Sequence, residues 1–80
     1  MNTYRWLNKE KSRYYTLEVK KDESNSINLY YRWGSCISNR GGKKNIVVST
    51  EEEVQIFIHQ MMKRRKNRGY DLIGSLISKG

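Results

Sequence analysis

Apolar and polar residues alternate along the stretch 13–19 in the first part of the chain. Tyr15, Leu17 and Val19 fall on one side of this stretch, and most residues between them are polar. A period of two with aromatic and β-branched residues is typical of a half-buried strand. The polar segment 20–26 that follows is rich in turn-forming residues. The sequence therefore predicts a strand over 13–19 that ends in a turn.

A second alternation runs over 27–33 and predicts an antiparallel partner for the first strand. One of its faces carries Ile27, Leu29, Tyr31 and Trp33. Tyr30 and Arg32 fall on the opposite face, either as solvent-facing strand residues or as a second contact surface. Trp33 is either the largest core residue of this sheet or a ligand contact, because tryptophan serves both roles.

Two adjacent glycines, Gly41 and Gly42, predict the turn of a second hairpin at residues 40–43. Glycine adopts the positive φ that tight hairpin turns need. The segments 35–39 and 44–49 flank this turn, and the second of them supplies the returning strand. Cys36 is then a small strand residue.

A helix is predicted to begin at Thr50. Thr50 with Glu53 forms a capping-box pattern, with Ser49 and Glu52 as the alternative register, and three consecutive glutamates suit the positive end of the helix dipole. Gly69 ends the helix. An apolar stripe that can lie on the sheet is formed by Val54, Phe57, Ile58, Met61 and Arg65.

The order of elements predicts one α+β domain over residues 1–80, with a core at about 13–73 and termini that fray. Tyr70, Leu72 and Ile73 favour a short closing strand after the helix, whereas Gly74 and the small tail favour fraying. A chain of 80 residues with 36% hydrophobic content supports one modest core.

Charge indicates the kind of partner. Sixteen Lys and Arg against eight Asp and Glu give a net charge of +8, which favours polyanions such as nucleic acid, although many small proteins are basic for solubility alone. The single cysteine excludes an intrachain disulfide and suits a reducing cytoplasm. The N-terminal residues lack the apolar region of a signal peptide, and the longest uncharged run is too short to cross a bilayer.

Catalytic and metal chemistry have little support in the sequence. Cys36 and His59 could form a nucleophile and base, but nothing local supplies an oxyanion hole or an orienting carboxylate. His59 has no second histidine or cysteine cluster with which to hold a metal. The sequence predicts a protein that is not an enzyme and needs no cofactor or metal.

Several motifs resemble those of the WGR domain family over residues 13–73. They are Trp33-Gly34, a glycine at position 41, the helix start at 50–54 and the close at 66–70. The resemblance implies a twisted antiparallel sheet of about four to five strands with one helix on one face. WGR modules occur in DNA-damage-dependent poly(ADP-ribose) polymerases and in several bacterial proteins. In the polymerases the family tryptophan lies against the sugar-phosphate backbone near a DNA break, a role that would fall to Trp33.

Two positions depart from the family pattern. Ser35 replaces the signature arginine, and Ile37 replaces a glycine that usually follows. In the polymerases that arginine helps to relay the DNA signal to a catalytic domain, so the resemblance does not extend that role to this chain.

These observations predict a non-enzymatic module that binds the DNA backbone, or DNA ends and breaks, without reading sequence. The predicted contact residues are Trp33, Gly34, Arg32, Arg40, Lys43, Lys44, Lys63 and Arg64. The segment 40–44 is alternatively a bare hairpin turn, and the cations of 63–68 are alternatively a solvated helix end. RNA is a further option, since aromatic and basic residues on a sheet suit single strands of either kind. The alternative function is an adaptor that docks an acidic protein partner, such as a repair enzyme, with no membrane involved.

Overall fold

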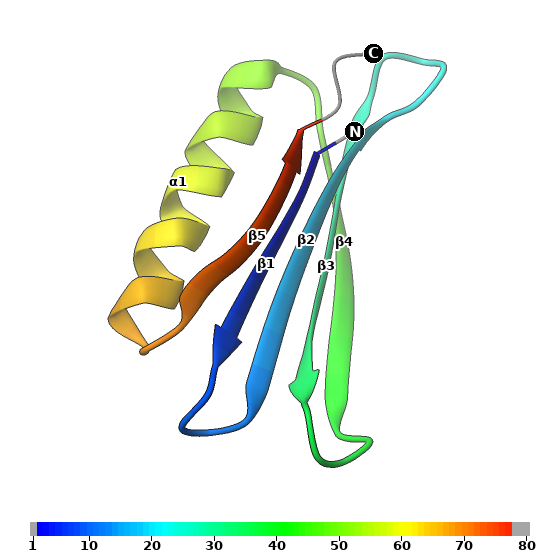
Figure 1. Ribbon diagram of the computed structural model, residues 1–80. Helices are drawn as coiled ribbons and strands as arrows, with labels where there is room; N and C mark the ends of the chain where they lie inside the picture. The colour runs from blue at the N-terminus through cyan, green and yellow to red at the C-terminus, as the bar shows by residue number, and fades with distance from the viewer. Residues whose placement is uncertain (1, 78–80) are drawn as a thin grey trace.

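The structure, a computed structural model, describes residues 2–77, with side chains up to residue 75. Five antiparallel strands form one sheet in the order β4-β3-β2-β1-β5, and a single helix packs on one of its faces (Figure 1). The fold is thus α+β, as predicted. The elements are β1 (Asn2–Asn8), β2 (Arg13–Lys21), β3 (Ile27–Ser35), β4 (Gly41–Val48), α1 (Glu51–Asn67) and β5 (Asp71–Ile77).

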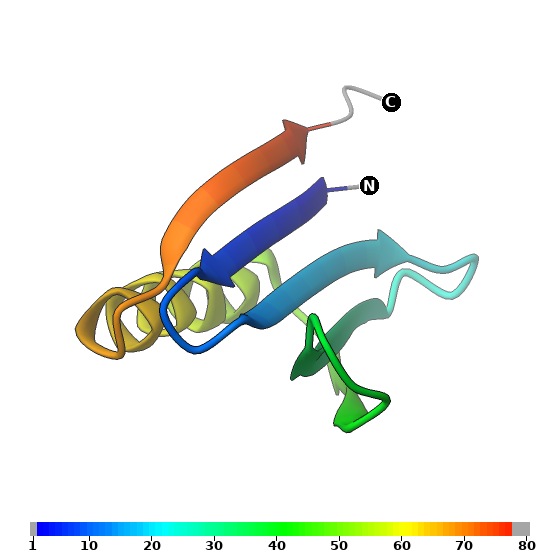
Figure 2. The same ribbon diagram turned by 60° about the horizontal axis from the view of Figure 1, so that its bottom comes forward.

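The core lies between α1 and the sheet face that the helix covers. Strand alternation directs one side chain in two towards the helix, and the predicted apolar faces of β2 and β3 are the buried ones. The sheet twists strongly, so strand direction turns from β5 at one edge to β4 at the other (Figure 2). The buried apolar residues are Tyr4, Trp6, Leu17, Val19, Ile27, Leu29, Val54, Ile58 and Met61.

Strand β1 was not predicted, yet it lies inside the sheet between β2 and β5. Tyr4 and Trp6 point into the core, and Trp6 is only 2% exposed. Its partner β5 is remote in sequence, because Asn2 pairs with Ile77 and Leu7 with Asp71. The alternation in β1 is short and breaks at Leu7 and Asn8, where the polar residue is the buried one, so the signal in the sequence is weak. The sheet therefore begins well before residue 13.

The predicted turn at 40–43 is wrong: residues 36–40 form the β3–β4 turn, and both glycines belong to β4. Gly41 pairs with Gly34, and Gly42 pairs with Trp33. Neither glycine has a positive φ. A Cβ on Gly42 would lie 2.8 Å from Cε2 of Trp33 and closer still to Cζ2, so its hydrogen makes room for the indole. These glycines serve packing and not turn geometry.

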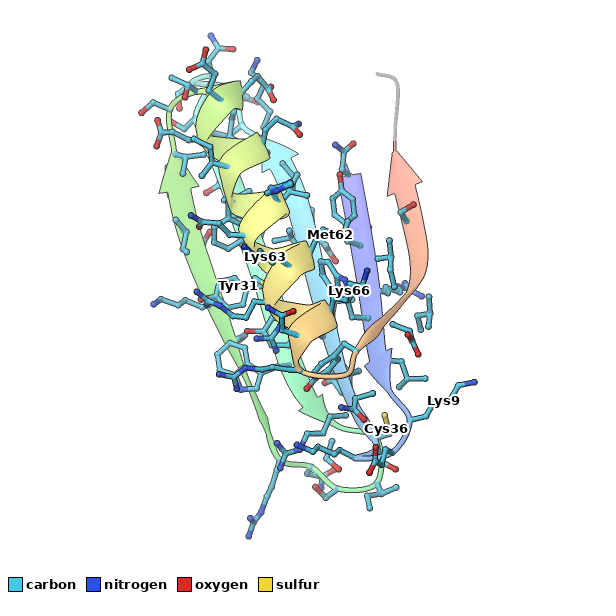
Figure 3. The ribbon with its side chains drawn as sticks, turned by 90° about the vertical axis from the view of Figure 1, so that its left-hand side faces the viewer. Lys9, Tyr31, Cys36, Met62, Lys63 and Lys66 are labelled. Carbon is cyan, nitrogen blue, oxygen red and sulfur yellow. The ribbon has the colours of Figure 1, made fainter. Side chains whose placement is uncertain are left out.

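Cys36 consequently lies in this turn, exposed, and is not a strand residue as predicted (Figure 3). The turn is held by the Ser35 amide, which donates to the Arg40 carbonyl over 2.9 Å, and by the Cys36 amide, which donates to the Ser12 carbonyl over 2.7 Å. The second bond joins the β3–β4 turn to the β1–β2 turn. Both turns therefore lie at the same end of the sheet.

The predicted helix cap is confirmed. The side chain of Thr50 accepts a hydrogen bond from the Glu53 amide over 3.2 Å, which satisfies one of the free N–H groups of the first turn. The predicted stripe is also confirmed, since Val54, Ile58 and Met61 are buried. Gly69 has a φ of +82° and follows the helix end, a conformation that glycine adopts at little cost.

The C-terminal segment forms the full strand β5, so the closing strand is confirmed over residues 71–77. The register between β1 and β5 shifts at Arg5 and Trp6, which leaves Ile73 without a partner in the ladder. Ile73 is 57% exposed. Gly74, which favoured fraying, lies inside β5, so fraying does not begin there. The rest of that prediction falls on residues 78–80, which lie outside the described part of the chain.

Candidate functional site

The end of the sheet below the helix C-terminus holds a pocket of about 750 Å³, which we call the Trp33 pocket. It is built where the β1–β2 turn, the β3–β4 turn and the end of α1 meet. Its charged and aromatic lining residues are Lys11, Arg13, Tyr15, Trp33, Arg40, Arg65, Arg68 and Tyr70, and Gly34, Ser35, Ser38 and Gly41 complete it.

Trp33 belongs to a cluster of three rings, with Tyr15 stacked on it and Tyr31 tilted against it. Its ring centroid lies 5.6 Å from that of Tyr31 and 5.9 Å from that of Tyr15. The indole packs over Gly42 and is half-buried, so it is neither a full core residue nor a freely exposed one. An aromatic ring fixed in this way presents apolar surface at low entropic cost, because its neighbours already hold its rotamer.

Arg65 supplies a fixed positive charge inside the pocket. It is 7% exposed, and its guanidinium carbon lies 4.1 Å from the centroid of Tyr15 and 5.1 Å from that of Tyr70. Cation–π contacts of this kind stabilise a desolvated guanidinium. The buried Nε of Arg65 makes no hydrogen bond with any residue that the structure describes.

Burial raises the pKa of the Tyr15 phenol, and the adjacent Arg65 guanidinium opposes that rise. The phenol therefore stays neutral and acts as a ring surface and a hydrogen-bonding group at physiological pH. A neutral phenol leaves the charge of Arg65 uncompensated within the pocket.

The remaining cations of the pocket are exposed. Lys11 and Arg13 come from the first hairpin, Arg40 from the β3–β4 turn and Arg68 from the helix end. None of the described lining residues is acidic. Among the side chains that the structure describes, the one ion pair within 4.0 Å joins Lys20 to Glu18, away from this pocket. Five cations thus surround one indole.

Asn8 holds the parts of the pocket together. Its amide nitrogen donates to the Arg68 carbonyl over 3.1 Å, and its amide oxygen accepts from the Lys11 amide over 2.9 Å. The side chain is 4% exposed. One buried amide therefore joins the helix end to the β1–β2 turn and fixes the backbones that carry two of the cations.

The predicted contact residues fall in three places. Trp33, Gly34 and Arg40 line the Trp33 pocket. Arg32 and Lys43 pair with each other on the sheet face that the helix leaves bare. Lys44 also lines the groove on that face, although strand alternation directs its side chain to the helix side of the edge strand β4. Lys63 and Arg64 join neither group and lie exposed on α1, where Figure 3 shows Lys63.

Sequence reasoning missed several residues of the pocket, namely Lys11, Arg13, Tyr15, Arg68 and Tyr70 as ligand contacts. A signal existed for Arg13, because it lies on the same strand face as Tyr15 and faces the same way as Trp33. The positions of Lys11 and Arg68 depend on turns that meet only in the folded chain. Arg65 was predicted on the packed stripe but not as part of a site.

Comparisons of the chain with family models, with curated proteins and with solved structures found no match. The resemblance to WGR modules therefore stays a prediction based on the residues given above. In the described part of the chain, no three His, Cys, Asp or Glu side chains group closely enough to hold a metal ion. Helix α1 does not have the length and apolar character needed to cross a membrane.

Proposed function

We propose that this protein is a non-enzymatic nucleic-acid-binding module that grips the DNA backbone at the Trp33 pocket without reading base sequence. One observation carries the proposal: a half-buried indole lies among five cationic side chains, and no carboxylate lines the same pocket. Phosphate neutralisation by Lys and Arg provides most of the affinity of non-specific nucleic-acid binding. We further propose a cytoplasmic location, in keeping with the exposed free thiol of Cys36.

The pocket supplies two kinds of contact that a sugar-phosphate chain needs. Arg13, Arg40 and Arg68 are exposed and can reach phosphate oxygens in pairs of hydrogen bonds. Arg65 adds a positive charge that two rings already hold in place. Binding therefore loses no side-chain entropy for this residue. The Trp33 indole offers a face to a sugar or to a terminal base.

This geometry favours DNA ends or breaks over the middle of a duplex. A stacked base is accessible only where its neighbour is missing, and the pocket of about 750 Å³ has room for few nucleotides. Base-specific reading is not favoured, because α1 packs its apolar stripe on the sheet and no second helix within residues 2–77 forms the motifs that enter a major groove.

The test is a fluorescence-anisotropy titration of blunt, nicked and intact duplexes, single-stranded DNA and RNA at two salt concentrations. Trp33→Leu should weaken binding to broken DNA on the order of tenfold, as expected for one stacking contact. Arg40→Gln should reduce the logarithmic salt slope by about 1, as expected for one phosphate contact. Lys66→Gln removes a charge from the outer face of the helix and serves as the control (Figure 3). Salt-insensitive binding, or equal losses in all three variants, would contradict the proposal.

A protein adaptor is the second candidate, and one observation favours it. Strand β4 is an edge of the sheet, and its Val47 is 60% exposed. An exposed edge can pair with an extended segment of another chain. Charge reversal at Arg13 and Arg40, which line the Trp33 pocket, separates the two candidates. Loss of nucleic-acid binding with purified protein supports the first candidate, whereas loss of co-purification of a cellular protein alone supports the adaptor.

A further inference from the structure

The sheet face opposite α1, which we call the open face, carries a second groove of about 880 Å³. No described element covers this face, since the single helix lies on the other side (Figure 1). The groove reaches all five strands, from β4 at one edge of the sheet to Ile73 of β5 at the other. The lining residues that matter here are Arg5, Tyr14, Thr16, Tyr30, Arg32 and Lys43.

Strand register arranges three cations of the open face in one row. Arg5 pairs with Thr16, Thr16 pairs with Arg32, and Arg32 pairs with Lys43. Side chains that pair across antiparallel strands lie on the same face and are close neighbours. The row therefore crosses β1, β2, β3 and β4 with a positive charge on every strand except β2.

Two tyrosines flank this row on opposite sides. Tyr14 precedes Thr16 on β2 and Tyr30 precedes Arg32 on β3, and because these strands are antiparallel the rings fall on either side of the row. Two residues along a strand span about 7 Å. Tyr14 is 38% exposed and Tyr30 is 40% exposed, and Nζ of Lys20 lies 5.7 Å from the centroid of the Tyr30 ring, so one face of Tyr30 is left for a base.

Gly34 shapes the position of Tyr14. A Cβ on Gly34 would lie 2.8 Å from the Tyr14 hydroxyl oxygen and 2.9 Å from Cε1, so the ring lies close against strand β3 only because position 34 has no side chain. Gly34 thus separates two aromatic residues, with Trp33 on the helix side and Tyr14 on the open face. The Tyr14 ring is held against the sheet as a platform and does not project freely.

Charge on the open face also favours an anion. Glu18 is the one acidic residue among the described lining, and its carboxylate is paired with Lys20 at 3.4 Å. Arg5, Arg32 and Lys43 have no carboxylate within 4.0 Å among the described side chains. A row of uncompensated cations between two accessible rings matches a chain of phosphates that carries unstacked bases.

We infer that the open face binds single-stranded nucleic acid, with bases on Tyr14 and Tyr30 and phosphates on Arg5, Arg32 and Lys43. The inference deepens the proposed function and rests on it for the class of ligand, but it uses different residues. A third hollow of about 620 Å³ connects the two surfaces around the β3–β4 turn, because it is lined by Arg40 of the Trp33 pocket and by Tyr14, Arg32 and Lys43 of the open face. The ligand that fits both surfaces is a broken duplex with an unpaired tail.

The test compares a blunt duplex, the same duplex with an unpaired thymidine tail, and the free single strand, all by anisotropy with the full chain. The tail has about 12 nucleotides, within the roughly 4 to 16 that a small β-sheet module covers. The double variant Y14L/Y30L should weaken binding of the tailed duplex and the single strand by about tenfold or more, through loss of stacking. It should leave binding of the blunt duplex unchanged. Y14F/Y30F keeps both rings and should bind as the parent protein does.

Arg32→Gln provides a second variant that does not depend on ring packing, and it should lower the salt slope for the tail by about 0.7. If both Y14L/Y30L and Arg32→Gln bind the tail as the parent protein does, the inference is overturned. If Trp33→Leu still weakens binding of the blunt duplex in that case, the proposed function stands. Tail binding that depends on the tyrosines, together with no binding of the blunt duplex, would support the open face and refute the Trp33 pocket. Absence of binding to all three ligands would refute both.

Discussion

Replacement of Gly42 by alanine tests whether this glycine exists to seat the Trp33 indole. A Cβ at position 42 would lie 2.8 Å from Cε2 and 3.2 Å from Cη2 of Trp33. Carbon atoms in contact prefer about 3.5–4.0 Å, so the ring has to move by about 1 Å. Tyr31 and Tyr15 already pack against the same indole, at 5.6 Å and 5.9 Å between centroids, and they limit that movement.

Overpacking of this kind costs about 1–3 kcal/mol of the free energy of unfolding. For a domain of this size, each kcal/mol lowers the Tm by about 4–8 °C, so Gly42→Ala should melt on the order of 5–20 °C lower. The assay is thermal unfolding followed by circular dichroism. The indole N–H resonance of Trp33, assigned with Trp33→Phe, should shift in the variant while that of Trp6 stays in place.

Gly74→Ala is the matched control, because nothing lies within 4 Å of a Cβ at that position and its φ is not positive. Exchange of glycine for alanine also stiffens the unfolded chain, which stabilises by about 0.4–1 kcal/mol. Gly74→Ala has the same effect on the unfolded chain but no clash in the folded state. The difference between the Tm values of the two variants therefore reports the contact with Trp33 alone. Equal Tm values and an unmoved Trp33 resonance would refute the reasoning.

Three further outcomes are expected. Thr50→Ala removes the helix cap and should cost about 1 kcal/mol of the free energy of unfolding in urea titrations, whereas Ser49→Ala, whose hydroxyl caps nothing among the described residues, should be close to neutral. Asn8→Ala leaves the Arg68 carbonyl and the Lys11 amide without their buried partner and should lower the free energy of unfolding by about 1–3 kcal/mol. Asn45→Ala on the exposed edge strand is the control and should change it little. Equal effects of the two substitutions would contradict the role of Asn8. Burial raises the pKa of the Tyr15 phenol above its usual 10.0, so the folded state holds this proton more tightly than the unfolded state does. The protonated phenol therefore contributes stability that is fully present below pH 10.0 and is lost as the pH rises through the folded-state pKa. Tyr15→Phe should remove this part of the alkaline loss of stability, as measured by urea titrations across alkaline pH, and an unchanged pH profile would count against it.

The parts of the fold that local pattern determines were predictable. Strands β2 and β3 follow from their alternation, and the helix follows from Thr50, its apolar stripe and Gly69. Strand β1 was missed because its stability comes from two partners, one of them at the far end of the chain. No local pattern in the sequence indicates a pairing of that range.

The glycine turn was misplaced for a different physical reason. Adjacent glycines usually indicate positive φ, but Gly41 and Gly42 are required by close approach: a Cβ on Gly41 would meet the Trp33 carbonyl oxygen, and one on Gly42 would meet the indole. Such a requirement depends on the register between β3 and β4, which places Trp33 opposite Gly42. The sequence shows the glycines but not which neighbour excludes a side chain.

The candidate site was predictable at its centre and not at its rim. Trp33, Gly34 and Arg40 follow from the strand end and its basic turn. Lys11 and Arg68 reach the same pocket only because Asn8 joins the first turn to the helix end. Arg65 was recognised by its helical spacing, but its contact with Tyr15 and Tyr70 requires the packed helix.

The position of β1 between β2 and the edge strand β5 has a consequence for how the chain folds. Its outer edge is completed only by β5, and the pairing of Leu7 with Asp71 closes a loop of more than sixty residues. Closure of a loop of that length costs about 4 kcal/mol of chain entropy before the contact rewards it. The hairpins β1–β2, β2–β3 and β3–β4 can each form from neighbouring residues, so we expect β5 to pair late. Until β5 pairs, the outer edge of β1 has free backbone N–H and C=O groups. We expect two folding chains to pair with each other most readily during this interval.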